Sequence, residues 1–562
     1  MPHPPIIWSI AGHDSSGGAG LSADQRAADA LGVHLCPVVA AITAQHSQGV
    51  QGVFPVAATT LAAQLHALAQ DLPPVAIKTG LLGSVEAILT VAQWVDHYRS
   101  QAAPGVDPHH HLALIVDPVL GATAGGIAFS DEPLVTAYRQ HLLPRATLIT
   151  PNRAEALRLL GRRAHHDGPS DEIPALAEAL HGLGARSVAI TGGDAWAAND
   201  EASAAAPRAL SDAADGPHCA DWISTPQAQG WLTAPRVNTP HGHGTGCTFA
   251  TGVAASMALG HGPADAIVLA KMLTHHALSH AHAAGQGAGP VLAQQRFAAG
   301  PAHGGAPLPW LGLGHDLPWR LTDSPFTPFT PPADGLYGIV GTAPLIEAAL
   351  HAGLRCLQLR HKAPEGVTEH IQHSITACAH AGAVLFINDH WRQALAAPPP
   401  DTQTPGFQLG LHLGQEDLLA LTPDERASLL AARHHVMLGL SSHSLWELAR
   451  AAGCGASTIA CGPVQATTTK DMPWLPQGED NLGWWVHNSP APVVAIGGLL
   501  NAADLTRFAP CQAAALCVVR GLGQTPSDLQ AALPKLRSAL AQARSKPACA
   551  PPPLPHPVLP AR

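Results

Sequence analysis

Residues 5–43, PIIWSIAGHDSSGGAGLSADQRAADALGVHLCPVVAAIT, contain one complete strand–helix–strand unit. The apolar runs 5–12 and 34–43 predict two buried strands, and the Ala-rich stretch 23–32 between them predicts a helix. A helical crossover of this kind makes the two strands run parallel in one sheet. The unit therefore predicts an α/β fold whose sheet is covered by helices.

The same rhythm continues to about residue 284, and each apolar run ends in polar or Gly residues. We expect one α/β domain over residues 1–284, with a mostly parallel sheet and a helical finish over 248–284. The further predicted strands are 75–80, 112–119, 147–152 and 187–194, and a further predicted helix is 59–72.

The chain changes character at about residue 285. Residues 285–334 are rich in Gly and Pro without a sustained period, which predicts an inter-domain linker whose Trp and Phe side chains dock on a domain surface. From 335 to 545 eight strand-like runs return, with helical patterns between most of them, which predicts a TIM (β/α)8 barrel. The Pro-rich residues 546–562 predict a disordered tail.

The composition excludes several classes of protein. Of 562 residues, 46% are hydrophobic and 12% are charged, and the formal net charge is −10. Without a dense Lys/Arg run, neither a nucleic acid nor an anionic membrane is an expected partner. We expect no signal peptide, and no apolar run approaches the length of a membrane span, about 18 residues.

The ten cysteines include no C-x-x-C pair, so they predict neither a disulfide scaffold nor a structural zinc site. Cys36, Cys356 and Cys517 stand in apolar runs and are expected to be small buried thiols. This usage of cysteine predicts a reducing, cytoplasmic location. The 35 histidines lack the spacing of a metal site.

The stretch HGHGTGCTFA (241–250) places Cys247 behind a Gly-rich turn at the start of an Ala-rich helix. Glycines let the backbone approach a ligand closely, and a helix N-terminus offers free N–H groups to an anion. The same N-terminus favours a thiolate, so the position predicts a lowered pKa for Cys247. Taken alone, such a turn is more often a simple helix entry, in which Cys247 only packs.

Three other strand ends carry similar features. Residues 11–24 form a Gly-rich loop, TPNRAE (150–155) supplies Asn152 and Glu155, and TGG (191–193) forms a further turn. Asn152 and Glu155 are suited to organising Mg²⁺ around phosphates. Together these features predict a ligand crevice at the carboxyl edge of the sheet.

Seven motifs, in order over residues 6–284, resemble the hydroxymethylpyrimidine (phosphate) kinase family: AGHDSSGGAG, ITAQHSQGV, IKTGLLGS, VDPVLGATAGG, LITPNRAEA, ITGGD and HGTGC. The resemblance implies a ribokinase-like three-layer α/β domain that phosphorylates the thiamine pyrimidine, with ATP as co-substrate and Mg²⁺. It implies that the pyrimidine is held by Gly12, Asp24 and Gln45, that the ATP and metal side is lined by Asp117, Asn152, Glu155 and Thr191, and that the catalytic groups are Lys78, Gly244, Gly246 and Cys247.

Two roles stay open within this resemblance. Cys247 stands where ribokinase-like kinases at large tend to carry an Asp base, so it either takes the proton of the substrate hydroxyl or mainly shapes the anion hole. Lys78 either acts in catalysis or only pairs with a neighbouring carboxylate.

Polar side chains also end the strand-like runs of the second half. Gln358, Arg360 and Lys362 alternate in QLRHK, so they point to one side, where they can grip an anion. Asp389 and Asp417 follow neighbouring runs and predict a Mg²⁺ site for a diphosphate, although either acid alone would be expected to cap a helix. TTTKD (467–471) and the Gly-rich ends of the seventh and eighth runs offer hydroxyl, Lys and backbone N–H groups to phosphate.

Six motifs across about residues 335–540 resemble thiamine phosphate synthase: Q-x-R-x-K, N-D, H-x-G-Q-E-D, S-x-H, G-P-x-x-x-T-x-T-K and a late Gly-Gly. The resemblance implies coupling of hydroxymethylpyrimidine diphosphate to hydroxyethylthiazole phosphate through a pyrimidine carbocation, with release of diphosphate. It implies that Mg²⁺ is bound by Asp389 and Asp417, the diphosphate by Arg360, Lys362, Asn388 and Lys470, the pyrimidine or its diphosphate by Gln358, His412 and Ser441, and the thiazole phosphate by Thr467, Thr469, Gly498, Val519 and Arg520. Arg520 stands where several relatives carry a small residue.

The two resemblances converge, because the product of the first reaction is the substrate of the second. They imply a bifunctional thiamine-biosynthesis enzyme with small-molecule substrates, and whether it forms a homo-oligomer stays open. One alternative is a kinase for pyridoxal or another heterocycle fused to the barrel, against which Gln45 and Cys247 argue. The other is that one half is a non-catalytic ligand-sensing module, which the retained charged site residues disfavour.

Overall fold

The computed structural model describes residues 3–121, 131–162, 172–192, 210, 216–363, 365–402, 404–467 and 473–560. The chain divides into two compact units, Met1–Leu317 and Pro318–Pro560.

In the described part of the first unit, a ten-stranded sheet has the order β10-β9-β8-β7-β6-β5-β4-β1-β2-β3. Strands β2, β1, β4, β5, β6 and β7 run parallel, and antiparallel strands extend the sheet at both ends. The α/β prediction is confirmed, whereas the antiparallel strands were not expected from the sequence. The strands are β1 (Ile6–Asp14), β2 (His34–His46), β3 (Gly49–Pro55), β4 (Ala76–Thr79), β5 (Ala113–Val116), β6 (Leu148–Ile149), β7 (Val188–Ile190), β8 (His218–Ser224), β9 (Gln229–Pro235) and β10 (Trp310–Leu311).

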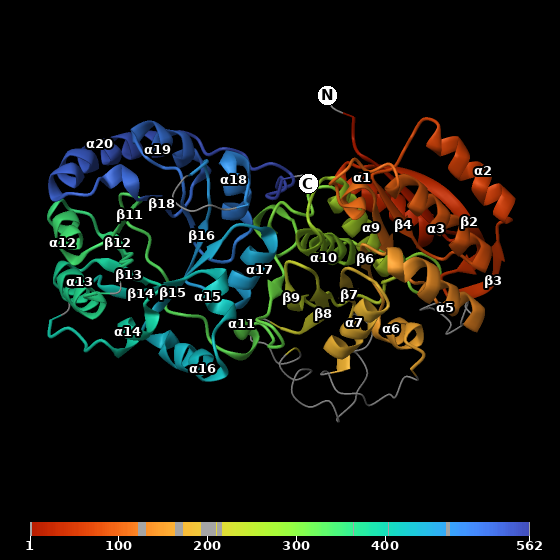
Figure 1. The fold of residues 1–562 in the computed structure, drawn as a ribbon, viewed down its shortest axis with the longest axis horizontal. Coiled ribbons are helices and arrows are strands. Elements are labelled where there is room, and N and C mark those ends of the chain that lie inside the picture. The colour runs from red at the N-terminus through yellow and green to blue at the C-terminus, as the bar shows by residue number, and fades with distance from the viewer. Residues whose placement is uncertain are drawn as a thin grey trace. The chain divides into compact units, whose positions relative to one another are not determined.

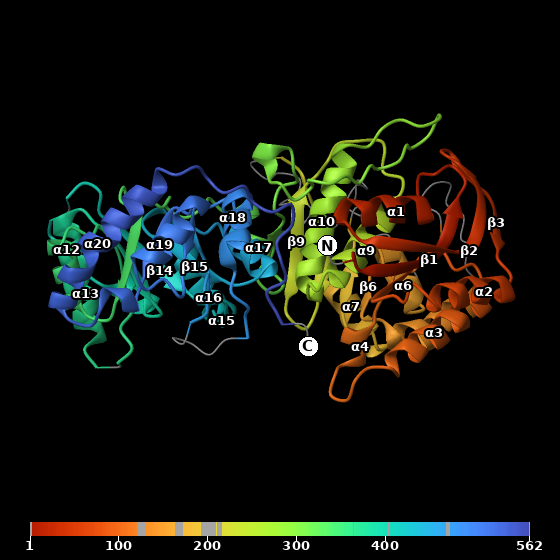
Figure 2. The same ribbon diagram turned by 90° about the horizontal axis from the view of Figure 1, so that it is seen from above.

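Helices cover both faces of this sheet and make three layers (Figure 2). Helices α1, α9 and α10 pack on one another on one face, and the group from α2 to α7 packs on the other. This confirms the ribokinase-like architecture. The helices are α1 (Gly20–Leu31), α2 (Ala58–Ala69), α3 (Val85–Arg99), α4 (Pro108–His111), α5 (Glu132–Ala137), α6 (Arg153–Leu159), α7 (Glu172–Gly182), α9 (Thr245–Ala258) and α10 (Pro263–Ser279).

The segment expected to be a linker is divided between the two units. Residues 285–317 belong to the first unit, where β10 pairs antiparallel with β9 and Phe297 and Leu311 are buried. Residues 318–334 belong to the second unit and contain the short helix α11 (Trp319–Thr322). The Gly and Pro residues do prevent long elements here, but the aromatic and Leu side chains between them bury enough apolar surface to hold the segment in place.

The described part of the second unit is a closed barrel of eight parallel strands in chain order, ringed by helices (Figure 1). The predicted TIM barrel is confirmed. Its strands are β11 (Leu336–Val340), β12 (Cys356–Leu359), β13 (Val384–Asn388), β14 (Gln408–Leu413), β15 (Met437–Ser442), β16 (Thr458–Cys461), β17 (Val493–Ala495) and β18 (Ala515–Val518). Its helices are α12 (Ala343–His351), α13 (Val367–Ala381), α14 (Trp391–Ala396), α15 (Gln415–Leu419), α16 (Pro423–Ala431), α17 (Leu445–Gly453), α18 (Gly478–Asn488), α19 (Ala502–Phe508) and α20 (Pro526–Arg544).

Inward-facing side chains fill the barrel. Tyr337, Phe386 and Met437 are buried there together, and Phe329 from the segment before the first strand joins the same cluster. The ring of Phe329 lies 5.9 Å from that of Phe386 in an edge-to-face contact. The barrel is therefore a packed core that includes part of the expected linker.

The C-terminal residues also differ from the expectation of a disordered tail. The structure describes them to residue 560, without regular elements after α20, and Val558 is 4% exposed. Proline fixes its own φ angle, so ordering a Pro-rich segment costs less conformational entropy than ordering most other sequences.

Among the described helices, none combines the length and the apolar character needed to cross a membrane. All ten cysteines are free thiols, and Cys36, Cys356 and Cys517 are buried as expected.

Candidate active sites

The parallel strand ends of the first unit bring several predicted residues together. Asn152 and Thr191, which follow β6 and β7, form a bridge between neighbouring segments. The Asn152 side chain accepts a hydrogen bond from the Glu155 amide (2.8 Å), and the Glu155 carboxylate accepts one from the Asn152 amide (2.9 Å). This capping box of α6 fixes both side chains at the edge where phosphates are expected.

The glycines before α9 form a tight turn with an open outer side. Gly244 has φ 89°, and a Cβ there would stand 2.3 Å from the Gly18 carbonyl oxygen, so only glycine fits. A Cβ at Gly246 would meet no heavy atom within 4 Å. The N-terminal amides of α9 therefore border open space, which an anion can fill.

Cys247 lies in the first turn of α9 and is partly exposed. Burial of its thiol raises the pKa of Cys247 to about 12, and the carboxylates of Asp24 and Asp117 add to the rise. The charge of Lys78 and a hydrogen bond from the Gly20 amide oppose it. The sequence-based expectation of a lowered pKa is therefore wrong, because desolvation outweighs the charge of Lys78 and the Gly20 hydrogen bond.

Asp24 and Lys78 form a fully buried ion pair beneath the turn. The Lys78 Nζ lies 2.9 and 3.0 Å from the two Asp24 carboxylate oxygens, and it lies 3.7 Å from an Asp117 oxygen. Asp24 also accepts hydrogen bonds from the hydroxyls of Ser9 (2.6 Å) and Thr251 (2.8 Å).

These contacts correct the role expected for Asp24. Its two oxygens already accept four hydrogen bonds from within the core, so it is not available to hold the pyrimidine. Lys78 does pair with a neighbouring carboxylate, that of Asp24, which was one of the two roles considered for it. Burial raises the pKa of Asp117 to about 6, although Lys78 opposes the rise.

His243 and Asp14 lie at the mouth of the same turn and were not among the expected site residues. The His243 Nε2 lies 2.8 Å from an Asp14 oxygen and 3.1 Å from the Gln45 side-chain amide. Although burial opposes it, hydrogen bonds from His243 and Ser16 hold the pKa of Asp14 well below its usual range. The signal was present, because both residues stand inside the Gly-rich motifs. Gly12 lies nearby, and its carbonyl oxygen would stand 2.2 Å from a Cβ at Gly20.

A second buried ion pair, Asp221–Lys271, lies beside the end of β7 and was not predicted from the sequence. The Lys271 Nζ lies 2.7 Å from one Asp221 oxygen, and the other Asp221 oxygen accepts a hydrogen bond from the Gly192 amide (3.0 Å). The pair therefore fixes the backbone at Gly192, next to Thr191.

In the second unit, polar side chains gather near the carboxyl ends of the barrel strands. The His412 Nε2 lies 2.9 Å from the Ser441 hydroxyl. Gln358 and His412 are buried, and the Gln358 Nε2 and His412 Nδ1 have no hydrogen-bond partner among the described residues. Burial, with a contribution from Arg360, lowers the pKa of His412 to about 4. Such unpartnered polar atoms in an apolar barrel can be satisfied by a polar ligand or by an ordered water.

The two carboxylates expected to bind Mg²⁺ follow adjacent strands. Asn388 pairs in register with His412, so Asp389 and Asp417 extend from neighbouring strand ends, and both are exposed. Asp389 has the left-handed φ of 64°, which is strained for a non-glycine residue and is often found at functional positions. One Asp417 oxygen accepts a hydrogen bond from the Gly414 amide at 3.1 Å.

The other expected contacts of the barrel also lie at strand ends. Arg360 continues β12, with its amide donating to the Val340 carbonyl (2.8 Å), and Lys362 is exposed beyond it. Gly498 has φ 81°, and a Cβ there would stand 2.5 Å from the Gln465 Cβ. Thr467, Val519 and Arg520 also lie in the described part of the chain, after β16 and β18, whereas Thr469 and Lys470 fall outside it.

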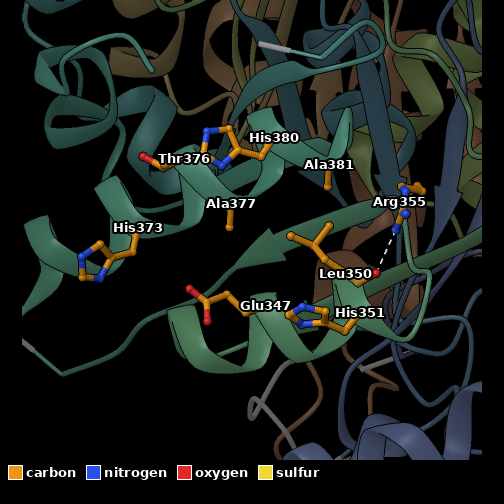
Figure 3. A pocket seen from close by; sticks show the side chains of 9 residues that line it. All are labelled: Glu347, Leu350, His351, Arg355, His373, Thr376, Ala377, His380 and Ala381. Carbon is orange, nitrogen blue, oxygen red and sulfur yellow. Dashed lines mark hydrogen bonds between the residues drawn. The ribbon is translucent and has the colours of Figure 1, made fainter. Parts of the chain in front are cut away.

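A cavity of about 530 Å³ between α12 and α13 is not part of this site (Figure 3). It is lined by residues in the C-terminal halves of both helices, among them Glu347 and His380. Arg355, which also lines it, stands before β12, at the opposite end of the strand from the expected substrate contacts.

Comparison with known families gives two matches that divide the chain. The model of the family described as phosphomethylpyrimidine kinase matches residues 14–292, and that described as thiamine monophosphate synthase matches residues 336–522.

Similar proteins include enzymes that carry both parts. A probable chloroplastic thiamine biosynthetic bifunctional enzyme of Oryza sativa is 29% identical and covers 94% of this chain and 87% of its own. The chloroplastic thiamine biosynthetic bifunctional enzyme of Arabidopsis thaliana is 30% identical and covers 88% of this chain and 85% of its own. A hydroxymethylpyrimidine/phosphomethylpyrimidine kinase of Synechococcus elongatus is 37% identical over 51% of this chain and 96% of its own.

The plant relatives overturn one expectation. A cytoplasmic location was expected from cysteine usage, but the two relatives that match over most of the chain are named as chloroplastic. Free cysteines indicate only a reducing environment, which is compatible with more than one compartment.

Proposed function

Because this chain belongs to the family of bifunctional thiamine biosynthetic enzymes, with a phosphomethylpyrimidine kinase half and a thiamine monophosphate synthase half, we propose that its two sites act in sequence on one pyrimidine. The first site uses ATP to phosphorylate hydroxymethylpyrimidine and then its phosphate. The second site joins the resulting diphosphate to hydroxyethylthiazole phosphate, which yields thiamine phosphate and diphosphate.

In the kinase half, the turn before α9 receives the transferred phosphoryl group. The amides around Gly244 and Gly246 stabilise the charge that develops on it, because they are fixed before the reaction and face open space. Cys247, once ionised to the thiolate, accepts the proton of the substrate hydroxyl and becomes a neutral thiol. Gln45 and the His243–Asp14 pair border the pyrimidine at the mouth of the turn.

The ATP side is formed by the ends of β5, β6 and β7. Asp117, Asn152 and Glu155 offer the oxygen ligands that Mg²⁺ prefers. A bound Mg²⁺ would neutralise charge on the phosphates, and the capping box holds two of its proposed ligands in a fixed orientation.

In the synthase half, the pyrimidine diphosphate lies across the strand ends of β12 to β15. Arg360, Lys362 and Asn388 bind the diphosphate. Asp389 and Asp417 would hold a Mg²⁺, which would supply positive charge to the leaving group. The C–O bond between the pyrimidine and the diphosphate breaks, and its electron pair leaves with the diphosphate. The thiazole nitrogen then donates its lone pair to the resulting carbocation and forms the new C–N bond. Gln358 and His412 supply the buried, unpartnered polar atoms that hold the pyrimidine ring.

One observation carries the kinase proposal: Cys247 lies behind an open glycine turn, next to the buried Asp24–Lys78 pair. The test supplies hydroxymethylpyrimidine, ATP, Mg²⁺ and thiazole phosphate, and measures both phosphorylated intermediates and thiamine phosphate. Parallel assays with pyridoxal test the alternative kinase substrate, and faster turnover of pyridoxal would contradict the proposal.

Two variants separate the halves. Cys247→Ser is expected to lower the rate of pyrimidine phosphorylation by about 100-fold, the scale of one lost acid–base group, and to leave the synthase rate unchanged. Asp417→Ala is expected to raise the Mg²⁺ concentration needed for synthesis without affecting the kinase. An unchanged Mg²⁺ titration would remove Asp417 from the metal site.

A further inference from the structure

The C-terminal segment 549–558, beyond the residues that match the synthase family, is held on the barrel at several points along its length. The Cys549 amide donates to the Pro510 carbonyl (3.0 Å), and a Cβ at Gly483 would stand 3.9 Å from the Pro551 Cα. At the far end, the Val558 carbonyl accepts a hydrogen bond from the Leu475 amide (2.8 Å). The segment thus follows one course over η5 (Ala509–Cys511), α18 and the residues before α18.

His556 makes the most connections in this segment. Its amide donates to the Asn481 side chain (2.8 Å), which in turn donates to the His556 carbonyl (3.0 Å). Its ring Nε2 lies 2.9 Å from the Gln477 carbonyl oxygen. Both partners are buried, Asn481 at 1% and Gln477 at 0% exposure. Loss of the His556 ring would remove one of the two hydrogen bonds that the buried Gln477 carbonyl accepts, the other coming from the Asn481 amide (3.3 Å).

Gln477 extends these contacts to the ends of two barrel strands. Its amide donates to the Pro463 carbonyl (2.8 Å), just after β16. Its side-chain amide donates to the His443 carbonyl (2.6 Å), just after β15. His443 is itself held by Glu447, whose carboxylate accepts from the His443 amide, and its ring stacks on Trp474 at 5.5 Å.

These two strand ends carry proposed substrate contacts. Ser441, two residues before His443, faces His412, and Thr467 follows Pro463 by four residues. A hydrogen-bonded chain therefore runs from the C-terminal segment, through Gln477, to the backbone that follows the neighbouring strands β15 and β16.

We infer that residues 549–558 act as a C-terminal clamp, in which His556 is a positioning residue for the synthase reaction. The clamp keeps the ends of β15 and β16 at the separation that the pyrimidine diphosphate and the thiazole phosphate require. It touches neither substrate and acts only through Gln477 and Asn481. The inference concerns the synthase half alone, so it does not depend on the proposed kinase roles.

The test compares three full-length point variants with a shortened chain. His556→Ala is expected to raise the KM for thiazole phosphate by about fivefold, the effect of one lost hydrogen bond, with a smaller change in kcat. His556→Gln, whose side-chain amide can still donate to the Gln477 carbonyl, is expected to restore most of the loss. Asn481→Ala is expected to act as His556→Ala does. A chain that ends at Ser545 is expected to lose at least about tenfold in kcat/KM, since every contact of the clamp is removed.

Two controls keep the test decisive. The first control is a chain that ends at Pro560, which retains the clamp and is expected to match the full-length protein. The second is the kinase rate of every variant, which measures the amount of folded first unit. Adding a peptide of residues 546–560 to the chain that ends at Ser545 is expected to lower the KM again. An unchanged KM in His556→Ala and in the shortened chain would overturn the inference. So would a fall in melting temperature with an unchanged KM, because it would show a purely structural role.

Discussion

At the N-terminus of α9, the ionisation state of Cys247 is expected to set the pH dependence of the kinase reaction. Because burial raises the pKa of the thiol to about 12, the thiolate fraction in the free enzyme rises about tenfold for each pH unit through neutral pH. If Cys247 is the proton acceptor, log kcat/KM for the pyrimidine is expected to rise with a slope near one between about pH 6.5 and 9. Steady-state kinetics across that range measure the slope. A flat profile would leave Cys247 only the role of shaping the anion hole.

The same ionisation is expected to govern chemical modification. Relative to a thiol at the ordinary value of 9.0, a pKa of about 12 leaves about a thousandfold less thiolate at pH 8. Cys549, the exposed cysteine, is therefore expected to react with iodoacetamide long before Cys247. Mass spectrometry of peptides at successive times gives the order. If Cys247 is modified before Cys549, the pKa of Cys247 is not raised, and the prediction fails.

For the buried Asp24–Lys78 pair, we expect that removing one charge destabilises the protein much more than removing both. Lys78→Met leaves the Asp24 carboxylate buried without a counter-charge, which typically costs about 3–5 kcal/mol. The double variant Asp24→Asn/Lys78→Met removes both charges and is expected to recover a large part of that loss. The free energies of unfolding of both variants are measured in urea, with hydrogen exchange in peptides of the first unit as the probe of unfolding. Lys546→Met is the matched control, since Lys546 is exposed.

At this scale the sequence predicted where the motifs of the proposed sites lie, but not what each side chain touches. The order of the motifs was enough to place Asn152 and Thr191 at strand ends and Cys247 at the start of a helix. Nothing in the sequence shows that Asp24 points into the core rather than toward a ligand, because Ser9, Lys78 and Thr251 meet it from three other segments. Burial of that kind depends on tertiary packing, and so does the sign of the Cys247 pKa shift.

At the scale of an element, the turn that opens α9 depends on Gly244 more than on Gly246. Gly244→Ala would force a left-handed backbone on an L residue and bring its Cβ to 2.3 Å from the Gly18 carbonyl, so both glycine loops must shift. We expect kinase kcat/KM to fall at least about 100-fold, with a loss of about 1–3 kcal/mol in stability. Gly246→Ala meets no atom and is expected to preserve stability. Equal melting temperatures for both variants would contradict this difference.

The elements themselves were predicted best where the hydrophobic period is regular. All eight barrel strands and the parallel strands of the first unit came from short apolar runs that end in polar residues. The hairpin β8–β9 and the two-residue strand β10 were missed, since β10 is a Trp–Leu pair inside a Gly/Pro-rich stretch and owes its place to pairing with β9. The C-terminal clamp was missed for a related reason: composition predicts the absence of regular elements, but it does not predict the absence of contacts.

At the scale of the whole molecule, the chain divides within the segment that composition had assigned to a linker. The unit boundary at Leu317–Pro318 predicts that residues 1–317 and residues 318–562, expressed separately, each keep their own activity within about twofold.

A barrel fragment that begins at residue 335, where the sequence placed the domain start, would lack Phe329, which is 5% exposed in the core. We expect that fragment to be less stable than 318–562 by about 3–5 kcal/mol, the usual cost of deleting a buried Phe. Phe329→Ala in the longer fragment is the matched variant and is expected to reproduce most of the loss in urea unfolding. Equal stability of the fragments that begin at 318 and 335 would show that residues 318–334 are a linker after all.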